Sequence, residues 1–131
     1  MTPASQGRPT TASSVEVGRP DLGPANATDG NLSTRWSSRF SDPQWLEVDL
    51  GSTTNVTDFR LVWEAAYAKQ YDLQFSDDSA TWTTAWHQGA GTGGTEKVHA
   101  PLSARYVRLH GTQRATIFGY SLYEFQVFAC P

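Results

Sequence analysis

Oxygen-bearing side chains gather in the segment NATDGNLSTRW, residues 26–36. Asp29, Asn31 and Thr34 offer oxygen ligands at short spacing, and Gly30 permits a tight turn among them. A hard cation such as calcium takes roughly six to eight oxygen ligands, backbone carbonyls included. The same residues also form an Asx turn without any metal, and the acidic residue that closes an EF-hand loop is missing. From these residues alone, the metal-free turn is the favoured interpretation.

A second set of polar and aromatic residues lies where strands are expected to end. Glu16 lies in a Ser/Val stretch, Arg35 precedes the segment WSSRF, and Glu64 ends an alternating segment. Tyr120 lies in GTQRATIFGYSL, a loop too long for a tight hairpin. Aromatic rings bind the C–H faces of sugars, and charged side chains bind sugar hydroxyls. Taken singly, each residue is typical of an ordinary surface; together they predict one rim of a domain that is used for binding.

Catalysis is the competing function. Glu16 and Glu64 could serve as the acid and the base of a small glycoside hydrolase. No deep cleft is expected in so small a domain, the three histidines are scattered along the sequence, and no Ser-His-Asp order stands out. The segment GAGTGG lacks the Lys-Ser/Thr pair of a phosphate loop and is interpreted as a turn. A non-catalytic binding domain is therefore favoured.

The elements that would position these residues are β-strands. Apolar and polar residues alternate with a period of two in most of the chain; in one segment, for example, Leu46, Val48 and Leu50 share a face. The predicted strands are QWLEVDLG, FRLVWE, YDLQFS, TWTTAWH, TEKVHA, ARYVRLHG and LYEFQVFA. Turns rich in Gly, Asp, Asn and Ser separate them, and almost no helix is expected. The pattern predicts an all-β antiparallel sandwich.

Composition narrows the possible partners. A chain of 131 residues suffices for one domain with a core. The net charge of −3 and the lack of a basic run argue against nucleic acid and anionic membranes, and no apolar run approaches the length of a membrane span. The single cysteine, Cys130, argues against a fold held by disulfides. Residues 1–11 are interpreted as a Ser/Thr/Pro linker remnant or tag, and residues 12–131 as the domain, cut from a larger protein.

Several segments, taken in order, resemble a discoidin-type domain, also called coagulation factor 5/8 type C. They are ATDGNLSTRWSS, QWLEVDLG, VWEAAYAKQYDLQFSDDSATWTT and RYVRLHGTQRATIFGYSLYEFQVFA. The version here is similar to carbohydrate-binding module family 32, and most to the modules of chitosanases and some β-glucanases. The resemblance implies an eight-stranded antiparallel jelly-roll β-sandwich. It also implies a secreted, non-catalytic module that targets a polysaccharide-degrading enzyme to its substrate.

The resemblance reverses the interpretation of the oxygen-rich turn. Members of the family hold one structural calcium ion there, and the last strand supplies the missing acid. The implied ligands are the Asn26 carbonyl, Asp29, Asn31, Thr34, the Tyr123 carbonyl and Glu124.

The resemblance also implies a sugar site at the rim opposite the chain termini. Its residues are Glu16, Arg35, Phe40, Glu64 and Tyr120, with Lys69 as a further candidate or simply a solvated charge. Phe40 keeps a ring where tyrosine is common, without the hydroxyl. Two glutamates would attract the ammonium group of glucosamine, so chitosan or glucosamine oligomers are the expected partner of a monomeric module. A β-1,3-glucan or a galactose-containing glycan remains the alternative.

Overall fold

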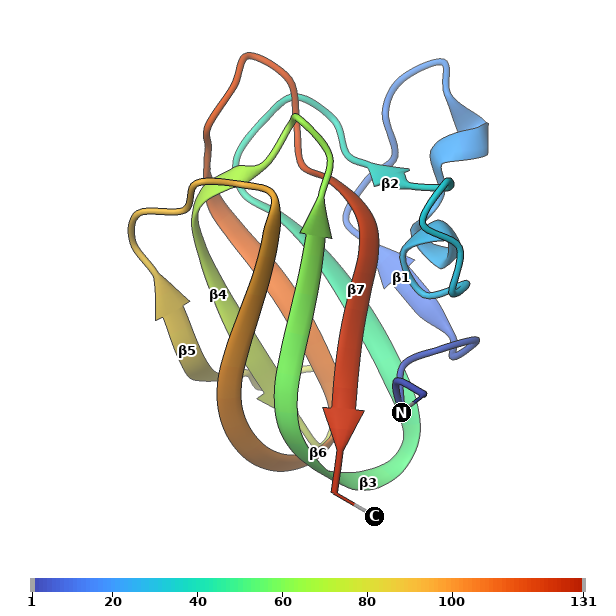
Figure 1. The fold of residues 1–131 in the computed structure, drawn as a ribbon, viewed down its shortest axis with the longest axis vertical. Coiled ribbons are helices and arrows are strands. Elements are labelled where there is room, and N and C mark those ends of the chain that lie inside the picture. Colours follow the sequence, from blue (N-terminus) through green and yellow to red (C-terminus); the bar gives the residue numbers. More distant parts are fainter. Residues whose placement is uncertain (1, 131) are drawn as a thin grey trace.

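Two layers of antiparallel strands face each other in the computed structural model, which describes residues 2–130 (Figure 1). Within these residues there are seven strands and two short 3-10 helices. The strands are β1 (Thr10–Ala12), β2 (Trp36–Ser37), β3 (Gln44–Trp63), β4 (Ala68–Ser76), β5 (Thr83–Gln88), β6 (Thr95–Arg114) and β7 (Ser121–Ala129). The helices are η1 (Pro20–Leu22) and η2 (Pro24–Ala27). Neither helix is long and apolar enough to cross a membrane, a finding that concerns the described residues.

The two longest strands, β3 and β6, pass through both layers. The first part of β3 pairs with β1 and with the end of β6, whereas its second part pairs with β7 and with the start of β6. The β3 strand changes layer near Gly51, whose φ of +89° is a conformation that glycine adopts readily. The register of the pairing between β3 and β6 shifts between Asp49 and Thr54. The β4 and β5 strands extend one layer, while β7 and β2 extend the other.

The expected all-β antiparallel sandwich is confirmed, but its strand count differs. Instead of eight strands, residues 2–130 form seven, because backbone pairing continues through each bend. QWLEVDLG and FRLVWE become the single strand β3, and TEKVHA and ARYVRLH become β6. The short strands β1 and β2 have too few residues to show a period and were not predicted.

Alternation along the strands produces the core. Leu46 and Leu61 of β3, Leu73 of β4, Leu109 of β6 and Phe125 of β7 are fully buried between the layers. Each lies on the face that alternation predicts, because successive strand residues point to opposite sides of a sheet. The core is therefore assembled from residues far apart in the sequence.

The interpretation of residues 1–11 as a linker is wrong for most of that segment. Ser5 is buried, and its hydroxyl donates to the Phe125 carbonyl while it accepts from the Val127 amide. The Ala4 amide donates to the Val127 carbonyl at 2.7 Å. Residues 10–12 form β1 on the edge of β3. The segment is polar because it lies on the surface of the sandwich, and its backbone bonds, which composition does not reveal, make it part of the domain.

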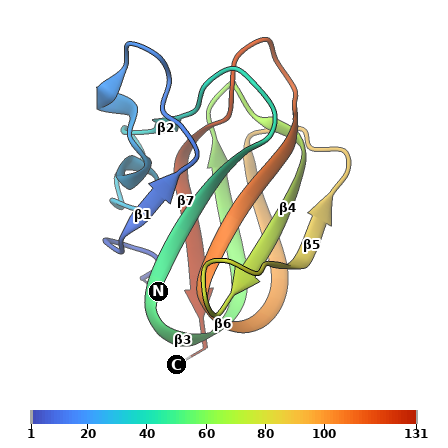
Figure 2. The ribbon, with the colours of Figure 1, turned by 180° about the vertical axis from the view of Figure 1, so that it is seen from behind.

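The loops divide the molecule into two ends. The chain termini lie together at one end, and the loops 38–43, 64–67 and 115–120 lie at the other (Figures 1 and 2). The loop that follows β1 runs toward the same end as these three loops. This rim gathers segments that are distant in the sequence.

Candidate glycan-binding rim

A hollow of about 290 Å³ opens among these loops. It is called the rim hollow below. Its chemistry is carried by Glu16, Arg35, Phe40, Glu64, Thr116 and Phe118, and small residues fill the wall between them. Four of the six residues predicted for the sugar site therefore lie in one hollow: Glu16, Arg35, Phe40 and Glu64.

The two carboxylates of the rim hollow are held by short-range bonds. Glu16 Oε1 accepts from the Ser37 hydroxyl at 2.8 Å, and the Glu16 amide donates to the Ser37 carbonyl. Glu64 Oε1 accepts from the Ala66 amide at 2.9 Å, and the Glu64 amide donates to the Ser121 carbonyl. Both carboxylates retain accepting capacity for a ligand, because a carboxylate can accept several hydrogen bonds.

A guanidinium lies beside the two carboxylates. Arg35 Nη1 donates to the Ser121 hydroxyl at 2.8 Å, which orients the guanidinium from the start of β7. No ion pair joins Arg35 to either glutamate, as far as residues 2–130 are concerned. The rim hollow thus combines two acceptors with one donor group, and none of the three charges is neutralised by direct pairing.

Two phenylalanines form the apolar wall of the rim hollow. Phe40 is 46% exposed and Phe118 is 52% exposed. Their rings meet edge to face, with centroids 5.5 Å apart and planes at 82°. Exposed aromatic pairs are uncommon on an ordinary surface, and a flat ring suits the C–H face of a sugar.

The loop that carries Phe40 is fastened to β6. Arg114 Nη1 donates to the Phe40 carbonyl at 2.8 Å, and Arg114 Nε donates to Asp42 at 3.2 Å. The Tyr120 hydroxyl also donates to Asp42, at 2.5 Å. Asp42 therefore ties together two loops that build the hollow.

The prediction that Tyr120 contacts sugar is wrong for this structure, because its side chain has no exposed surface. Its ring packs against Gly111, where a Cβ would collide with it. Burial, and then the bond to Asp42, raise the pKa of the Tyr120 hydroxyl. Phe118, two residues earlier, is the ring that reaches the hollow. The loop carries an aromatic residue on each side of Gly119, and the sequence alone did not distinguish the buried ring from the exposed one.

Lys69 is exposed near the start of β4 and does not line the rim hollow. Thr116 does line it and was not predicted. Nothing in its sequence surroundings separates Thr116 from the other hydroxyl residues of the loop.

The oxygen-rich turn forms as a network of Asx-type bonds. Asp29 Oδ1 accepts from the Asn31 amide at 2.9 Å, and Asp29 Oδ2 accepts from the Thr34 hydroxyl at 2.5 Å. Asn31 Oδ1 accepts from the Ser33 amide at 2.8 Å. Gly30 has a φ of +76°, as a tight turn here requires.

Glu124 faces this turn from β7. Its side chain is only 1% exposed, and its Oε2 has no hydrogen-bond partner within residues 2–130. Burial, followed by the nearby Asp29 carboxylate, raises the pKa of Glu124 to about 7. A buried, unpartnered carboxylate oxygen next to a second carboxylate is unfavourable unless a cation or a proton compensates it.

The donor set at the turn suits calcium. Beside Asp29 and Glu124, the turn contains the Asn31 side-chain amide, the Thr34 hydroxyl and the Asn26 carbonyl, all of them hard oxygen donors. No group of three or more His, Cys, Asp or Glu side chains gathers anywhere in residues 2–130 as a metal cluster would. A calcium ion would thus be held here largely by neutral oxygens.

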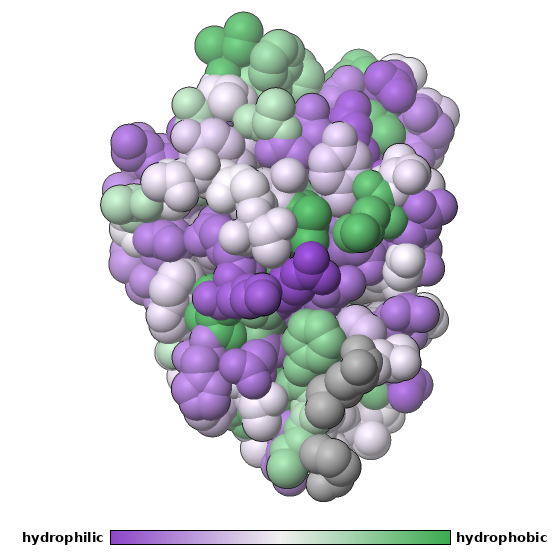
Figure 3. All heavy atoms as spheres, in the orientation of Figure 1, coloured by the Kyte–Doolittle hydropathy of each residue, from purple (hydrophilic) through white to green (hydrophobic). Residues whose placement is uncertain are grey.

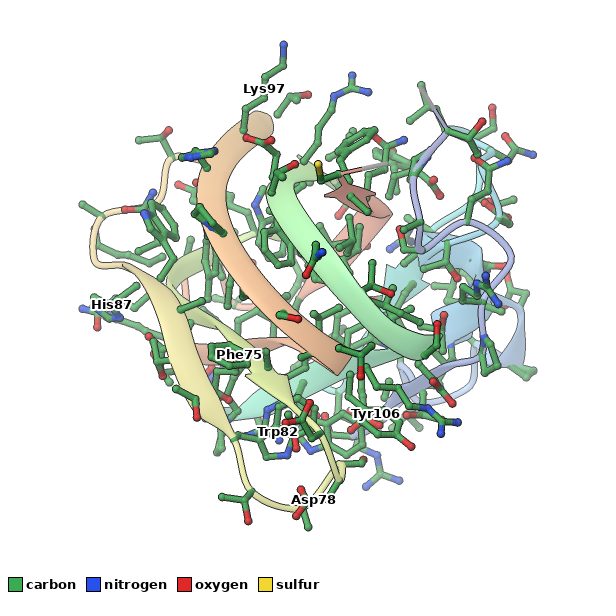
Figure 4. The ribbon with its side chains drawn as sticks, turned by 90° about the horizontal axis from the view of Figure 1, so that it is seen from below. Phe75, Asp78, Trp82, His87, Lys97 and Tyr106 are labelled. Atoms are coloured by element: carbon green, nitrogen blue, oxygen red, sulfur yellow. The ribbon has the colours of Figure 1, made fainter. Side chains whose placement is uncertain are left out.

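The other charged groups of the sheets lie outside the rim. A larger, open hollow of about 600 Å³ lies over β3, β6 and β7, the face seen in Figure 3, with Arg60, Lys97 and Phe128 among its walls. Viewed from the end of the termini, His87 and Lys97 lie on different strands and point away from each other (Figure 4). Within residues 2–130, His87 pairs with Asp72 and His99 with Asp58, and neither pair has a serine bonded to it. The third histidine, His110, has no partner at Nδ1, so no His of residues 2–130 is joined to both a serine and an aspartate.

Comparison with known proteins identifies the family. The F5/8 type C domain family matches residues 9–125. Chitosan-binding module 1 from a chitosanase/glucanase of Paenibacillus sp. IK-5 is 41% identical, with 98% of this chain and 100% of that chain covered and a TM-score of 0.92. Module 2 of the same enzyme, in complex with chitotriose, is 38% identical, with 96% and 99% covered and a TM-score of 0.90.

Two further matches are more distant or shorter. A family 32 carbohydrate-binding module from C. perfringens NanJ, in complex with galactose, is 22% identical with 96% and 97% covered and a TM-score of 0.80; it shows the shared fold alone. The polysaccharide lyase 8 family protein HylA of Enterococcus faecalis is 35% identical over 68 residues, which are 52% of this chain and only 5% of that protein. By sequence and by fold, the chain belongs to the F5/8 type C domain family.

Proposed function

We propose that this domain is a non-catalytic carbohydrate-binding module that binds glucosamine units of chitosan through the rim hollow. One observation carries the proposal: two carboxylates and two half-exposed phenyl rings meet in a single hollow on one rim. The proposal is supported by two solved relatives at about 40% identity, which are named as chitosan-binding modules.

The chemistry of the hollow suits an amino sugar. The carboxylates of Glu16 and Glu64 attract an ammonium group and accept hydrogen bonds from its N–H groups. Such hydrogen bonds between charged groups are stronger than those between neutral groups. The rings of Phe40 and Phe118 contact the C–H face of the pyranose, and Arg35 donates to a ring hydroxyl. A neutral glucan would use the rings and the guanidinium but would leave both carboxylates without a charged partner.

A structural calcium ion belongs to the same proposal. The Asn26 carbonyl, Asp29, Asn31, Thr34, the Tyr123 carbonyl and Glu124 would hold it, joining the early turn to the last strand. The unpartnered Glu124 Oε2, on a carboxylate beside Asp29, supports this assignment. Bound there, the ion would stabilise the fold rather than take part in chemistry, since protein oxygens would fill its coordination shell.

The same proposal places the domain in a larger protein. A binding module concentrates a catalytic domain on an insoluble polysaccharide, which is found outside the cell. We therefore expect the domain to act, as a monomer, within a secreted polysaccharide-degrading enzyme. Two of the relatives are derived from a chitosanase/glucanase.

The test is isothermal titration of the domain with oligomers of chitosan, chitin and laminarin. Chitosan oligomers should bind more tightly than the other two, and added salt should weaken their binding because the rim is open to solvent. Glu64→Gln should reduce the affinity about tenfold or more, since it leaves the ammonium with one carboxylate. The matched control is Glu47→Gln, which removes the same charge from a β3 residue that bonds Ser79.

Two results would contradict the proposal. Binding to laminarin alone, or equal binding of chitin and chitosan, would remove the role of the ammonium group. Release of reducing sugar that is lost in Glu16→Gln would show that the domain is an enzyme.

A further inference from the structure

The rim hollow does not end at Phe40. A second hollow of about 350 Å³, called the flanking hollow, is lined by Glu16, Val17, Arg39, Phe40 and Ser41. It shares Glu16 and Phe40 with the rim hollow, so these two side chains form the ridge between them. A third, more open hollow continues from Arg39 and Ser41 past Ser13, Ser14 and Gln44. The three hollows form one track along the rim.

The charge along this track changes sign. The rim hollow contains two carboxylates and one guanidinium, for a net charge of −1. The flanking hollow contains the shared Glu16 and Arg39, which cancel. The third hollow contains Arg39 and no acidic side chain, for a net charge of +1. An ammonium group is therefore attracted in the rim hollow, loses that net attraction in the flanking hollow, and is repelled only in the third hollow, where Arg39 is the one charged side chain.

The flanking hollow offers contacts that suit an acetamide group. Val17 is 77% exposed and lies beside the Phe40 ring, so together they provide apolar surface for a methyl group. The Arg39 guanidinium makes no hydrogen bond or ion pair within residues 2–130, whereas its backbone is held by bonds to the hydroxyls of Ser14 and Ser38. Ser41 accepts from Gln44 at 2.9 Å, which leaves its own hydroxyl hydrogen available. Arg39 and Ser41 can both donate to an acetamide carbonyl.

We infer that the flanking hollow is a second sugar subsite that selects an N-acetylated, uncharged unit next to the free glucosamine of the rim hollow. The inference rests on the proposed function and extends it from a single sugar to a pattern. The domain then discriminates partially acetylated chitosan from fully deacetylated chitosan. The ridge residues contact both units, and Arg39 determines the preference.

The test is titration with the four disaccharides of glucosamine and N-acetylglucosamine, both mixed orders included. One mixed disaccharide should bind about three- to fivefold more tightly than the glucosamine disaccharide, a size typical of exposed charges. Arg39→Glu should reverse that order, because it places a carboxylate beside the second amine. Val17→Ser should weaken only the acetylated ligands. The matched control is Arg8→Glu, which makes the same change of charge at an exposed residue beside Gly51, at the bend of β3.

The outcomes separate this inference from the proposed function. If glucosamine oligomers bind and Glu64→Gln weakens them, but Arg39→Glu leaves the ranking of the four disaccharides unchanged, the second subsite is refuted and the rim hollow stands. If the glucosamine disaccharide binds better than both mixed ones, the charge argument is refuted. If no glucosamine oligomer binds, both proposals are overturned.

Discussion

Glu124→Gln should make the metal-free domain more stable and, at the same time, abolish its response to calcium. In the native state Glu124 is buried beside Asp29, and its pKa rises from 4.5 to about 7. Between these two values the native state binds more protons than the unfolded chain, so the stability of the metal-free domain falls as the pH rises. Above pH 7 the full cost is present.

The magnitude follows from the two pKa values. Moving the pKa of an acid from 4.5 to about 7 corresponds to about 3 kcal/mol of unfolding free energy at high pH. Glutamine keeps the shape of the side chain without its charge, so this cost disappears. For a domain of this size, 3 kcal/mol corresponds to roughly 10 °C in melting temperature. Calcium at a hundred times its dissociation constant would stabilise the wild type by about 2.7 kcal/mol.

The assay is thermal unfolding at pH 8, with chelator and with calcium. With chelator, the variant should have a higher melting temperature than the wild type. With calcium, the melting temperature of the wild type should rise, whereas that of the variant should not change. At pH 4 without metal, where Glu124 is protonated in both states, the two should melt nearly alike. Equal melting temperatures in chelator at pH 8, or the same gain from calcium in both proteins, would refute the reasoning.

Four further variants test how the rim is built. Phe118→Ala should weaken glycan binding about tenfold with little change in melting temperature, whereas Tyr120→Phe should lower stability by about 1 kcal/mol and leave the contact surface intact; the reverse pattern in titration and thermal unfolding would contradict the assignment. Gly111→Ala should destabilise the domain by about 1–3 kcal/mol in denaturant unfolding, since its methyl group meets the Tyr120 ring, and a neutral result would contradict the packing. Arg114→Ala should weaken binding about threefold by releasing the Phe40 loop, and unchanged affinity in titration would show that the loop is held by other contacts.

Part of the proposed glycan site was predictable because its residues are polar or aromatic side chains at strand ends. Glu16, Arg35, Phe40 and Glu64 meet in one hollow, as the family resemblance implied. The choice between Phe118 and Tyr120 was not predictable, since both aromatic residues lie in the same loop. Which ring turns inward depends on Gly111 and Asp42, which lie on other segments of the chain.

The turn at residues 26–34 shows the same division. Its local bonds follow from residue type, because Asp, Asn and Thr side chains bond the backbone a few positions away. The acid opposite the turn is Glu124, on the last strand, and residues alone did not link the two. Their proximity depends on how η2 and its turn pack on β7, a long-range contact that alternation does not encode.

Local sequence patterns suffice to predict the all-β class, the inward faces of the strands and a fold without an internal disulfide. Each follows from local alternation or from a simple count, because a strand's side chains point to opposite faces whatever its partners are. Three features appear only in the folded molecule: β3 and β6 each serve both layers, residues 4–12 belong to the domain, and carboxylates from distant loops share one hollow. These features depend on backbone pairing and packing between segments far apart in the chain, which no local pattern specifies.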